Sequence, residues 1–182
     1  MKPIKTIGHS NHPIERFVDL LKAGGVETLV DVRSTPYSRR FPQFGREKLT
    51  TTLAGSGIDY LFAGAALGGK SSASYDTSAA RPEFRDALSD LIARADTRTL
   101  CLMCAEKEPL DCHRTVLVSR RLTERGVMLE HLLADGRTVP HSVIEETLLA
   151  KVGGPDLFSV GDGRASRLAR AWEARERAMK RT

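Results

Sequence analysis

The most reactive part of the sequence is an eleven-residue segment that begins at Cys104 and reads CAEKEPLDCHR. It contains a second thiol, Cys112, together with the Glu106 carboxylate, the His113 imidazole and the Arg114 guanidinium. Thiolates act as nucleophiles and redox groups, imidazoles transfer protons, and guanidinium groups bind anions. The segment therefore predicts nucleophilic, acid–base or thiol redox chemistry on a substrate that carries negative charge.

The two thiols of this segment are expected at a strand end and at a helix start. An apolar run at 99–103 precedes Cys104 and an amphipathic run at 115–125 follows, which is the pattern of a strand, a loop and a helix. Free N–H groups and nearby cations at a helix start stabilise a thiolate, which favours Cys112 as nucleophile or redox group. The loop between the cysteines can fold back and bring the thiols together. For both cysteines, a buried structural role is the alternative.

His113 and Arg114 follow Cys112 directly. His113 is a candidate general acid or base, or a hydrogen-bond partner for a substrate. A histidine that only binds a backbone carbonyl is the alternative. Arg114 in the first helical turn suits a bound anion, and an internal pair with Glu106 or Asp31 is the other interpretation.

A metal site is the less favoured interpretation of this segment. Cys101 and Cys104 form a CxxC pattern, but an odd separation on a strand directs the two side chains to opposite faces, so we expect Cys101 in the core. Cys104, Cys112 and His113 with His9 or His131 would supply Cys and His donors, yet the paired spacings of structural zinc sites are absent. The sequence favours a site with no metal and no cofactor.

Strand and helix patterns alternate along most of the chain. This alternation predicts an α/β fold, a three-layer sandwich in which a mainly parallel five-stranded sheet is flanked by helices. The Asp135-Gly136 turn predicts a small hairpin that ends near Val139. The strands are expected at 4–8, 28–33, 58–62, 99–103 and 127–132.

Polar residues follow several of the predicted strands. In an open parallel sheet, ligands bind beyond the carboxyl ends of the strands. Ser38 and Arg39 could recognise a phosphate through a hydroxyl and a guanidinium, although a solvated loop is the alternative. Gly68 and Gly69 would let the backbone approach a ligand closely, or form a simple turn. The other candidates at these strand ends are His9, Ser10, Asp31, Arg33, and Glu130 or His131.

The chain divides into three parts by composition. Residues 1–150 form the predicted α/β domain, 151–163 a glycine-rich linker, and 164–182 a basic helix or tail that could pack through Trp172. The last part carries seven basic and two acidic residues, so it accounts for the whole net charge of +5. The Ser/Ala-rich stretch at 71–80 is expected to be a long mobile loop over the site.

The composition is that of a cytoplasmic protein without a membrane partner. At 182 residues and 41% hydrophobic content, the chain can form one domain with an ordinary core. We find no apolar run of membrane-spanning length and no signal peptide. Three cysteines argue against a disulfide scaffold.

Several short segments resemble the family called domain of unknown function 488. They are TIGHS at Thr6, LVDVR at Leu29 with Pro36 and Ser38-Arg39, LGG at Leu67, and the CAE and CHR ends of the reactive segment. The resemblance covers about residues 4–145 and implies a compact α/β domain, without implying a particular reaction. The matching positions are His9, Ser10, Asp31, Arg33, Ser38, Arg39, Gly68, Gly69, Cys104, Glu106, Cys112, His113 and Arg114.

These observations favour an enzyme, a hydrolase or transferase, that acts on a phosphate-bearing nucleotide or nucleic-acid substrate. Arg33, Arg39 and Arg114 would hold the anion, and Cys112 or His113 would carry out the chemistry. Glu106 or Asp31 would orient the reacting groups. A nucleic-acid-binding module without catalysis and a thiol redox or sulfur-transfer protein that uses both thiols of the segment are the alternatives.

Overall fold

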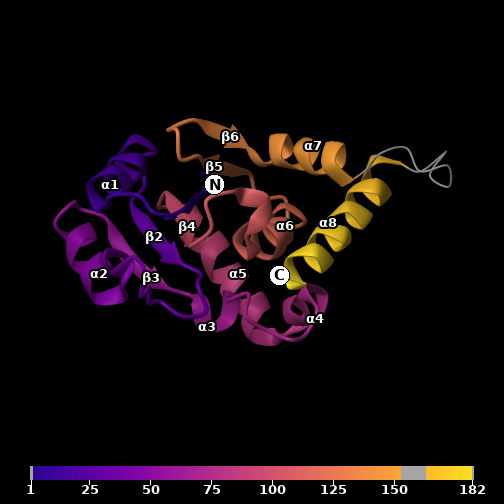
Figure 1. The fold of residues 1–182 in the computed structure, drawn as a ribbon, viewed down its shortest axis with the longest axis horizontal. Coiled ribbons are helices and arrows are strands. Elements are labelled where there is room, and N and C mark those ends of the chain that lie inside the picture. Colours follow the sequence, from indigo (N-terminus) through magenta and orange to yellow (C-terminus); the bar gives the residue numbers. More distant parts are fainter. Residues whose placement is uncertain (1, 153–162, 182) are drawn as a thin grey trace.

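A computed structural model describes residues 2–152 and 163–181 of the chain (Figure 1). One six-stranded sheet forms its centre, with the strand order β3-β2-β4-β1-β5-β6. All neighbouring strands are parallel except β5 and β6. The strands are β1 (Ile4–Gly8), β2 (Thr28–Asp31), β3 (Asp59–Phe62), β4 (Leu100–Cys104), β5 (Leu129–Leu132) and β6 (Thr138–Pro140).

The predicted α/β sandwich is confirmed, but the predicted count of five strands is one too low. The sixth strand, β6, pairs antiparallel with β5, and Val139 lies opposite His131. The turn before it contains Gly136 at a φ of +95°, a backbone conformation that glycine adopts without strain. The sequence predicted the hairpin, and its three-residue second arm completes the sheet.

Helices cover both faces of the sheet. The helices α1 (Ile14–Ala23) and α2 (Arg46–Ala54) pack on one face, where Cys101 and Met103 of β4 join Phe17 and Leu53 in the core. Figure 1 shows these two helices together on the left of the view. The opposite face packs against α5, against α8 (Arg164–Lys180), and against the helical segments that follow the loop between Cys104 and Cys112, here called the reactive loop. The short helical segments elsewhere are η1 (Pro42–Phe44), α3 (Gly64–Leu67) and α4 (Tyr75–Ala80); α5 spans Pro82–Ala95.

Alternation along β4 places its two cysteines on opposite faces, as predicted. Cys101 is fully buried in the core beneath α1, whereas Cys104 belongs to the other core cluster and also faces the site. Cys101 therefore takes no part in the reactive cluster.

The segment after the reactive loop is helical, but it is not a regular α-helix. It consists of a 3₁₀ turn η2 (Pro109–Asp111), a π-helix η3 (Arg114–Ser119) and α6 (Arg120–Thr123). The Cys112 carbonyl accepts the first helical hydrogen bonds, from the N–H groups of Thr115 and Val116. Cys112 itself is extended, with φ −136° and ψ 138°, so it lies at the N-terminal boundary of the helix as expected. π-helical turns are frequent at functional sites.

The prediction of a long loop over 71–80 is wrong for its second half. Tyr75 to Ala80 form α4, and the Ser74 hydroxyl caps this helix by accepting a hydrogen bond from the Thr77 N–H. The Glu176 carboxylate accepts a second bond, from the Tyr75 N–H at 2.7 Å. This tertiary contact lies 101 residues away, so local composition could not reveal it.

The C-terminal part of the described chain is helical. Helix α7 (His141–Val152) packs against α8 (Arg164–Lys180), and Trp172 of α8 is 2% exposed. The predicted glycine-rich linker falls mostly at 153–162, which lies outside the described residues. Among the residues that are described, no helix combines the length and the apolar composition that crossing a membrane requires.

Candidate functional site

The carboxyl ends of the three central strands, β2, β4 and β1, open into one cavity of about 570 Å³. Cys104 comes from the end of β4, Arg33 from the segment after β2, and His9 from the segment after β1. The loop and helix start that contain Glu106, Cys112 and His113 form another wall of this cavity. The carboxyl ends of parallel strands lie along the same edge of a sheet. Residues that follow different strands therefore come together here from distant parts of the chain, as predicted. Neither Ser10, Gly68 nor Arg114 lines this cavity.

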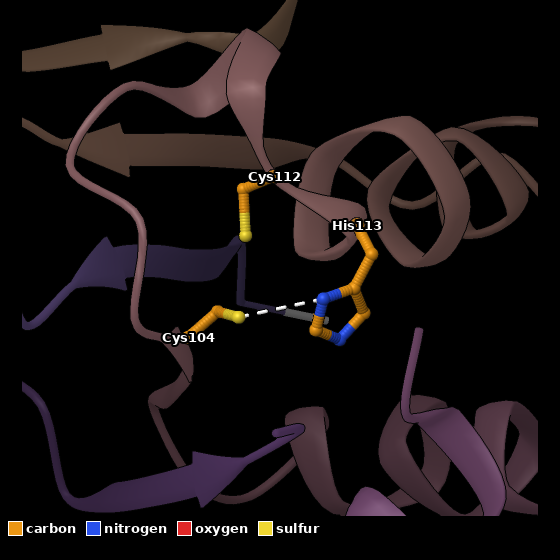
Figure 2. A group of neighbouring side chains, drawn as sticks. All are labelled: Cys104, Cys112 and His113. Carbon is orange, nitrogen blue, oxygen red and sulfur yellow. Dashed lines mark hydrogen bonds between the residues drawn. The ribbon is translucent and has the colours of Figure 1, made fainter. Parts of the chain in front are cut away.

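Two thiols and one imidazole converge on the floor of the cavity (Figure 2). The Cys104 Sγ, the Cys112 Sγ and a His113 ring nitrogen all lie within 4.8 Å of one another. The Cys104 Sγ is 3.4 Å from His113 Nδ1, and His113 Nε2 is 2.9 Å from the Val32 carbonyl oxygen. Because a carbonyl only accepts, Nε2 carries a proton, and Nδ1 of the neutral ring presents its lone pair to the sulfur atoms.

The environment makes the two thiols unequal. Burial disfavours the Cys112 thiolate, but the hydrogen bond with Cys104, the Arg114 charge and His113 outweigh it and lower the pKa of Cys112 well below its usual value. The hydrogen bond with Cys112 and burial raise the pKa of Cys104 well above its usual value. Burial opposes the charged form of His113, yet its contact with Cys112 raises the His113 pKa overall. The cluster therefore favours one thiolate next to one thiol.

Arg33 and Asp31 form a buried pair beside the cavity. The Arg33 Nε donates to Asp31 Oδ1 at 2.9 Å, and Nη2 donates to Asp31 Oδ2 at 2.6 Å and to the Phe44 carbonyl at 2.8 Å. The Tyr60 hydroxyl also donates to Asp31, at 2.7 Å. Asp31 is thus saturated by internal donors, and the pair holds the chain after β2 in place.

His9 lies against this pair and shapes the cavity wall. Its Nδ1 is 2.9 Å from the Ser10 carbonyl, and Nε2 faces Arg33 Nη1 at 3.2 Å. The ring stacks on Phe44 with 4.3 Å between ring centroids. Burial lowers the pKa of His9 to about 4, so the ring is neutral at pH 7. Ser10, with a φ of 48°, faces an adjacent cavity that His9 and Glu106 also line.

Arg114 is buried and holds the reactive loop. Its Nη1 and Nη2 donate to the carbonyls of Glu106 and Lys107, at 2.5 and 3.2 Å. Only 1% of the residue is exposed. The side-chain partners found for its guanidinium are these two backbone carbonyls, and not the carboxylate of Glu106 or Asp31 that the sequence suggested. Arg114 fixes the loop between the two thiols and favours the Cys112 thiolate through its charge. Glu106 keeps its carboxyl on the cavity wall, and burial is the main cause that raises the pKa of this group.

The two predicted glycines approach protein groups. A Cβ atom on Gly69 would lie 2.4 Å from His113 Cγ, so only a glycine fits against the ring. A Cβ atom on Gly68 would lie 2.4 Å from the Ser34 hydroxyl oxygen. Gly69 therefore positions His113.

The cavity rim carries cations and hydroxyls, some of which were not predicted from the sequence. Arg39 and Ser38 were predicted, and the Ser38 hydroxyl accepts from the Phe41 N–H at 3.0 Å. Lys70 also lines the cavity. No interaction of the Arg39 or Lys70 side chain is found within residues 2–152 and 163–181. The remaining lining residues that were missed are Ser34, Thr35, Tyr37, Tyr75, Ala105, Asp111 and Met179.

Tyr75 and Met179 had no usable sequence signal, because they reach the cavity from α4 and α8. Helix α8 contacts two segments that border the cavity, α4 and the 3₁₀ turn η2. Lys180 lies over the Tyr75 ring, 4.7 Å from its centroid, and Arg175 donates to the Leu110 carbonyl at 2.7 Å.

These features define an α/β protein with a Cys–His cluster at the carboxyl ends of its central strands. A family model described as Domain of unknown function DUF488 matches residues 13–121. This is more than half of the chain, and the chain belongs to that family. The match includes the reactive segment but ends before β5 and both C-terminal helices. No curated protein and no solved structure matches the chain.

Proposed function

We propose that this protein is an enzyme, a hydrolase or transferase, that acts on a phosphate-bearing nucleotide or nucleic-acid substrate. One observation carries the proposal. The Cys–His cluster and a set of cationic and hydroxyl side chains line the same cavity, which has the volume of a small-molecule site.

The substrate phosphate is expected at the rim. Arg39 and Lys70 are exposed cations without internal partners in the described part of the chain, and Ser38 lines the same cavity. Guanidinium, ammonium and hydroxyl groups are the donors that phosphate oxygens accept from. Arg33 and Arg114 are committed to internal acceptors, so they supply background positive charge and hold the walls.

The reaction is expected at the floor. Cys104, Cys112 and His113 form the reaction centre, and Glu106 is the nearby proton donor or acceptor. A carboxyl group whose pKa is raised, as burial does for Glu106, exchanges protons closer to neutral pH than an exposed one.

Assays of nucleotide binding and of turnover test the cationic rim and the Cys–His cluster separately. Calorimetric titration with nucleoside monophosphates, with chromatography for turnover, should show binding that weakens about 10-fold or more in the double variant Arg39→Ala/Lys70→Ala. The variant Cys112→Ser should keep binding and lose turnover. Lys22→Ala is the matched control, because Lys22 is an exposed cation on α1 away from the cavity. Equal affinity in the double variant and the control, or no binding of any phosphate-bearing compound, would contradict the proposal.

A thiol redox or sulfur-transfer function is the second candidate. It is favoured by the sulfur atoms of Cys104 and Cys112, which lie within 4.8 Å of each other. Treatment with oxidised glutathione should then form a disulfide that links these two residues, seen as a loss of two hydrogens in the peptide mass spectrum. Stable free thiols under those conditions would exclude it.

A function as a module that only binds nucleic acid has less support, because basic residues of α8 form ion pairs within the protein. Arg164 pairs with Glu145 and Glu146, and Arg175 pairs with Asp111. Several of its cations are therefore engaged within the protein, where they connect α8 to neighbouring elements.

A further inference from the structure

We propose that Cys104, Cys112 and His113 bind a divalent transition-metal ion, with zinc preferred, and leave one coordination position open to the cavity. The inference rests on the proposed function, because the same three residues form its reaction centre. It adds the class of cofactor that this centre holds.

The donor atoms have the spacing that a tetrahedral zinc ion requires. With zinc–sulfur bonds of about 2.3 Å and zinc–nitrogen bonds of about 2.0 Å, tetrahedral angles place sulfur and nitrogen about 3.5 Å apart and two sulfurs about 3.8 Å apart. The Cys104 Sγ and His113 Nδ1 are 3.4 Å apart, and every pair in the group lies within 4.8 Å. Small side-chain movements therefore complete the coordination.

The ring nitrogen of His113 that faces away from the sulfurs makes the hydrogen bond that metal-binding histidines usually make. The Val32 carbonyl accepts from Nε2, which fixes the tautomer and leaves the lone pair on Nδ1, facing the sulfurs (Figure 2). Histidine ligands almost always donate their other ring N–H to a carbonyl, a carboxylate or water. Gly69 packs closely against the ring, so the orientation of the ring is set before any ion arrives.

Charge and burial also favour a cation. Cys104 is 5% exposed and Cys112 is 1% exposed, so a second thiolate in this position is costly without an opposite charge. A divalent ion neutralises two thiolates, and thiolate with imidazole is a donor set that selects zinc and other soft ions over magnesium or calcium.

The number of ligands points to an open site. Within residues 2–152 and 163–181, no further cysteine, histidine, aspartate or glutamate belongs to the group. Structural zinc has four protein ligands, whereas catalytic zinc has three and holds water or substrate at the fourth position. The fourth position here would face the cavity, where the ion can polarise a water molecule or a substrate oxygen.

Metal binding can be measured without knowledge of the substrate. The full chain, stripped with a chelator, is titrated with zinc against a chromophoric competitor and, separately, with cobalt(II). We expect one ion per chain, a cobalt spectrum with a thiolate-to-metal charge-transfer band, and tetrahedral ligand-field bands. The variants Cys104→Ser, Cys112→Ser and His113→Gln should each weaken zinc binding about 100-fold or more. Cys101→Ala should bind as the wild type, because this thiol lies on the opposite face of the sheet.

Some results would overturn the proposal. They are a cobalt spectrum without a charge-transfer band, equal zinc affinity in all variants, or a Cys104–Cys112 disulfide in the stripped protein that zinc does not prevent. Circular dichroism identifies a variant that fails to fold. In that case, zinc should still raise the melting temperature of the wild type but not of the remaining folded ligand variants. If zinc binds as expected but no nucleotide does, the proposed function fails alone. If nucleotides bind and zinc does not, the metal proposal fails alone.

Discussion

The buried pair of Asp31 and Arg33 gives a stability prediction that separates a structural role from a substrate-binding role. Asp31 is fully buried and accepts hydrogen bonds from the Arg33 backbone N–H, from Arg33 Nε and Nη2, and from the Tyr60 hydroxyl. The substitution Asp31→Asn removes the negative charge and replaces one acceptor oxygen with an amide NH₂ group. The Arg33 cation stays buried, 5% exposed, and faces one amide oxygen, the Phe44 carbonyl and His9 in place of a carboxylate.

The expected cost is large because a charge loses its partner in a buried position. Breaking a buried ion pair in this way typically costs about 3–5 kcal/mol, out of a total stability of about 5–15 kcal/mol. We therefore expect Asp31→Asn to lower the free energy of unfolding by about 3–5 kcal/mol. The double variant Asp31→Asn/Arg33→Met removes both charges and should lose clearly less than the sum of the two single variants.

Urea denaturation, followed by circular dichroism and Trp172 fluorescence, measures this cost. The matched control is Asp90→Asn, which breaks an exposed pair with Arg94 and should change the stability by about 0.5 kcal/mol or less. A free energy of unfolding for Asp31→Asn within about 1 kcal/mol of the wild type would refute a role of the buried pair in holding the chain after β2.

Further predictions concern the rest of the molecule. His131 Nε2 lies 2.9 Å from His141 Nδ1, and burial lowers the pKa of His131 well below 6.5 and that of His141 to about 4. In the unfolded chain these imidazoles bind protons at a higher pH than in the folded protein, so acid favours unfolding. His141 alone should lower the free energy of unfolding by about 3 kcal/mol as the pH falls from 6.5 to 4; a urea midpoint that does not change between pH 7 and pH 4 would disprove this. Gly69→Ala should displace the His113 ring and weaken zinc binding about 10–100-fold, and unchanged affinity would show that Gly69 does not position the ring. Glu176→Gln should loosen α4 and speed iodoacetamide labelling of the metal-free cluster, relative to the exposed control Glu173→Gln; equal rates in the two variants would show that the bond from Tyr75 to Glu176 does not hold this wall of the cavity in place.

The fold was predictable from the sequence because its signals are local. Alternating strand and helix patterns gave the parallel α/β sandwich, and the Asp135-Gly136 turn gave the hairpin whose second arm is β6. The loop prediction for 71–80 failed in its second half because Tyr75 is held by Glu176, and a contact across 101 residues leaves no trace in local composition.

The site was predictable in position more than in the role of each residue. Placing polar residues at strand ends correctly gathered His9, Arg33, Cys104 and His113 around one cavity. Their partners depend on three-dimensional packing. The sequence could not show that Arg114 would be occupied by the carbonyls of its own loop, nor that the Val32 carbonyl would fix the tautomer of His113.

A metal site was disfavoured from the sequence because paired ligand spacings are absent, and the structure shows how the three side chains come together without them. Paired spacings such as CxxC place two ligands on one tight turn, whereas here one proposed ligand comes from a strand end and two adjacent ones from a helix start. The reactive loop, held by Arg114, brings these ligands together.

The central claim is that Cys104, Cys112 and His113 form one centre that binds a metal ion. The most direct test is a crystal structure of the zinc-loaded full chain, with anomalous diffraction measured on both sides of the zinc absorption edge. We predict one zinc peak bonded to both sulfur atoms and to His113 Nδ1, with a water molecule or an anion from the cavity as the fourth ligand. A disulfide between the two cysteines, or zinc bound elsewhere beside two free thiols, would contradict the account.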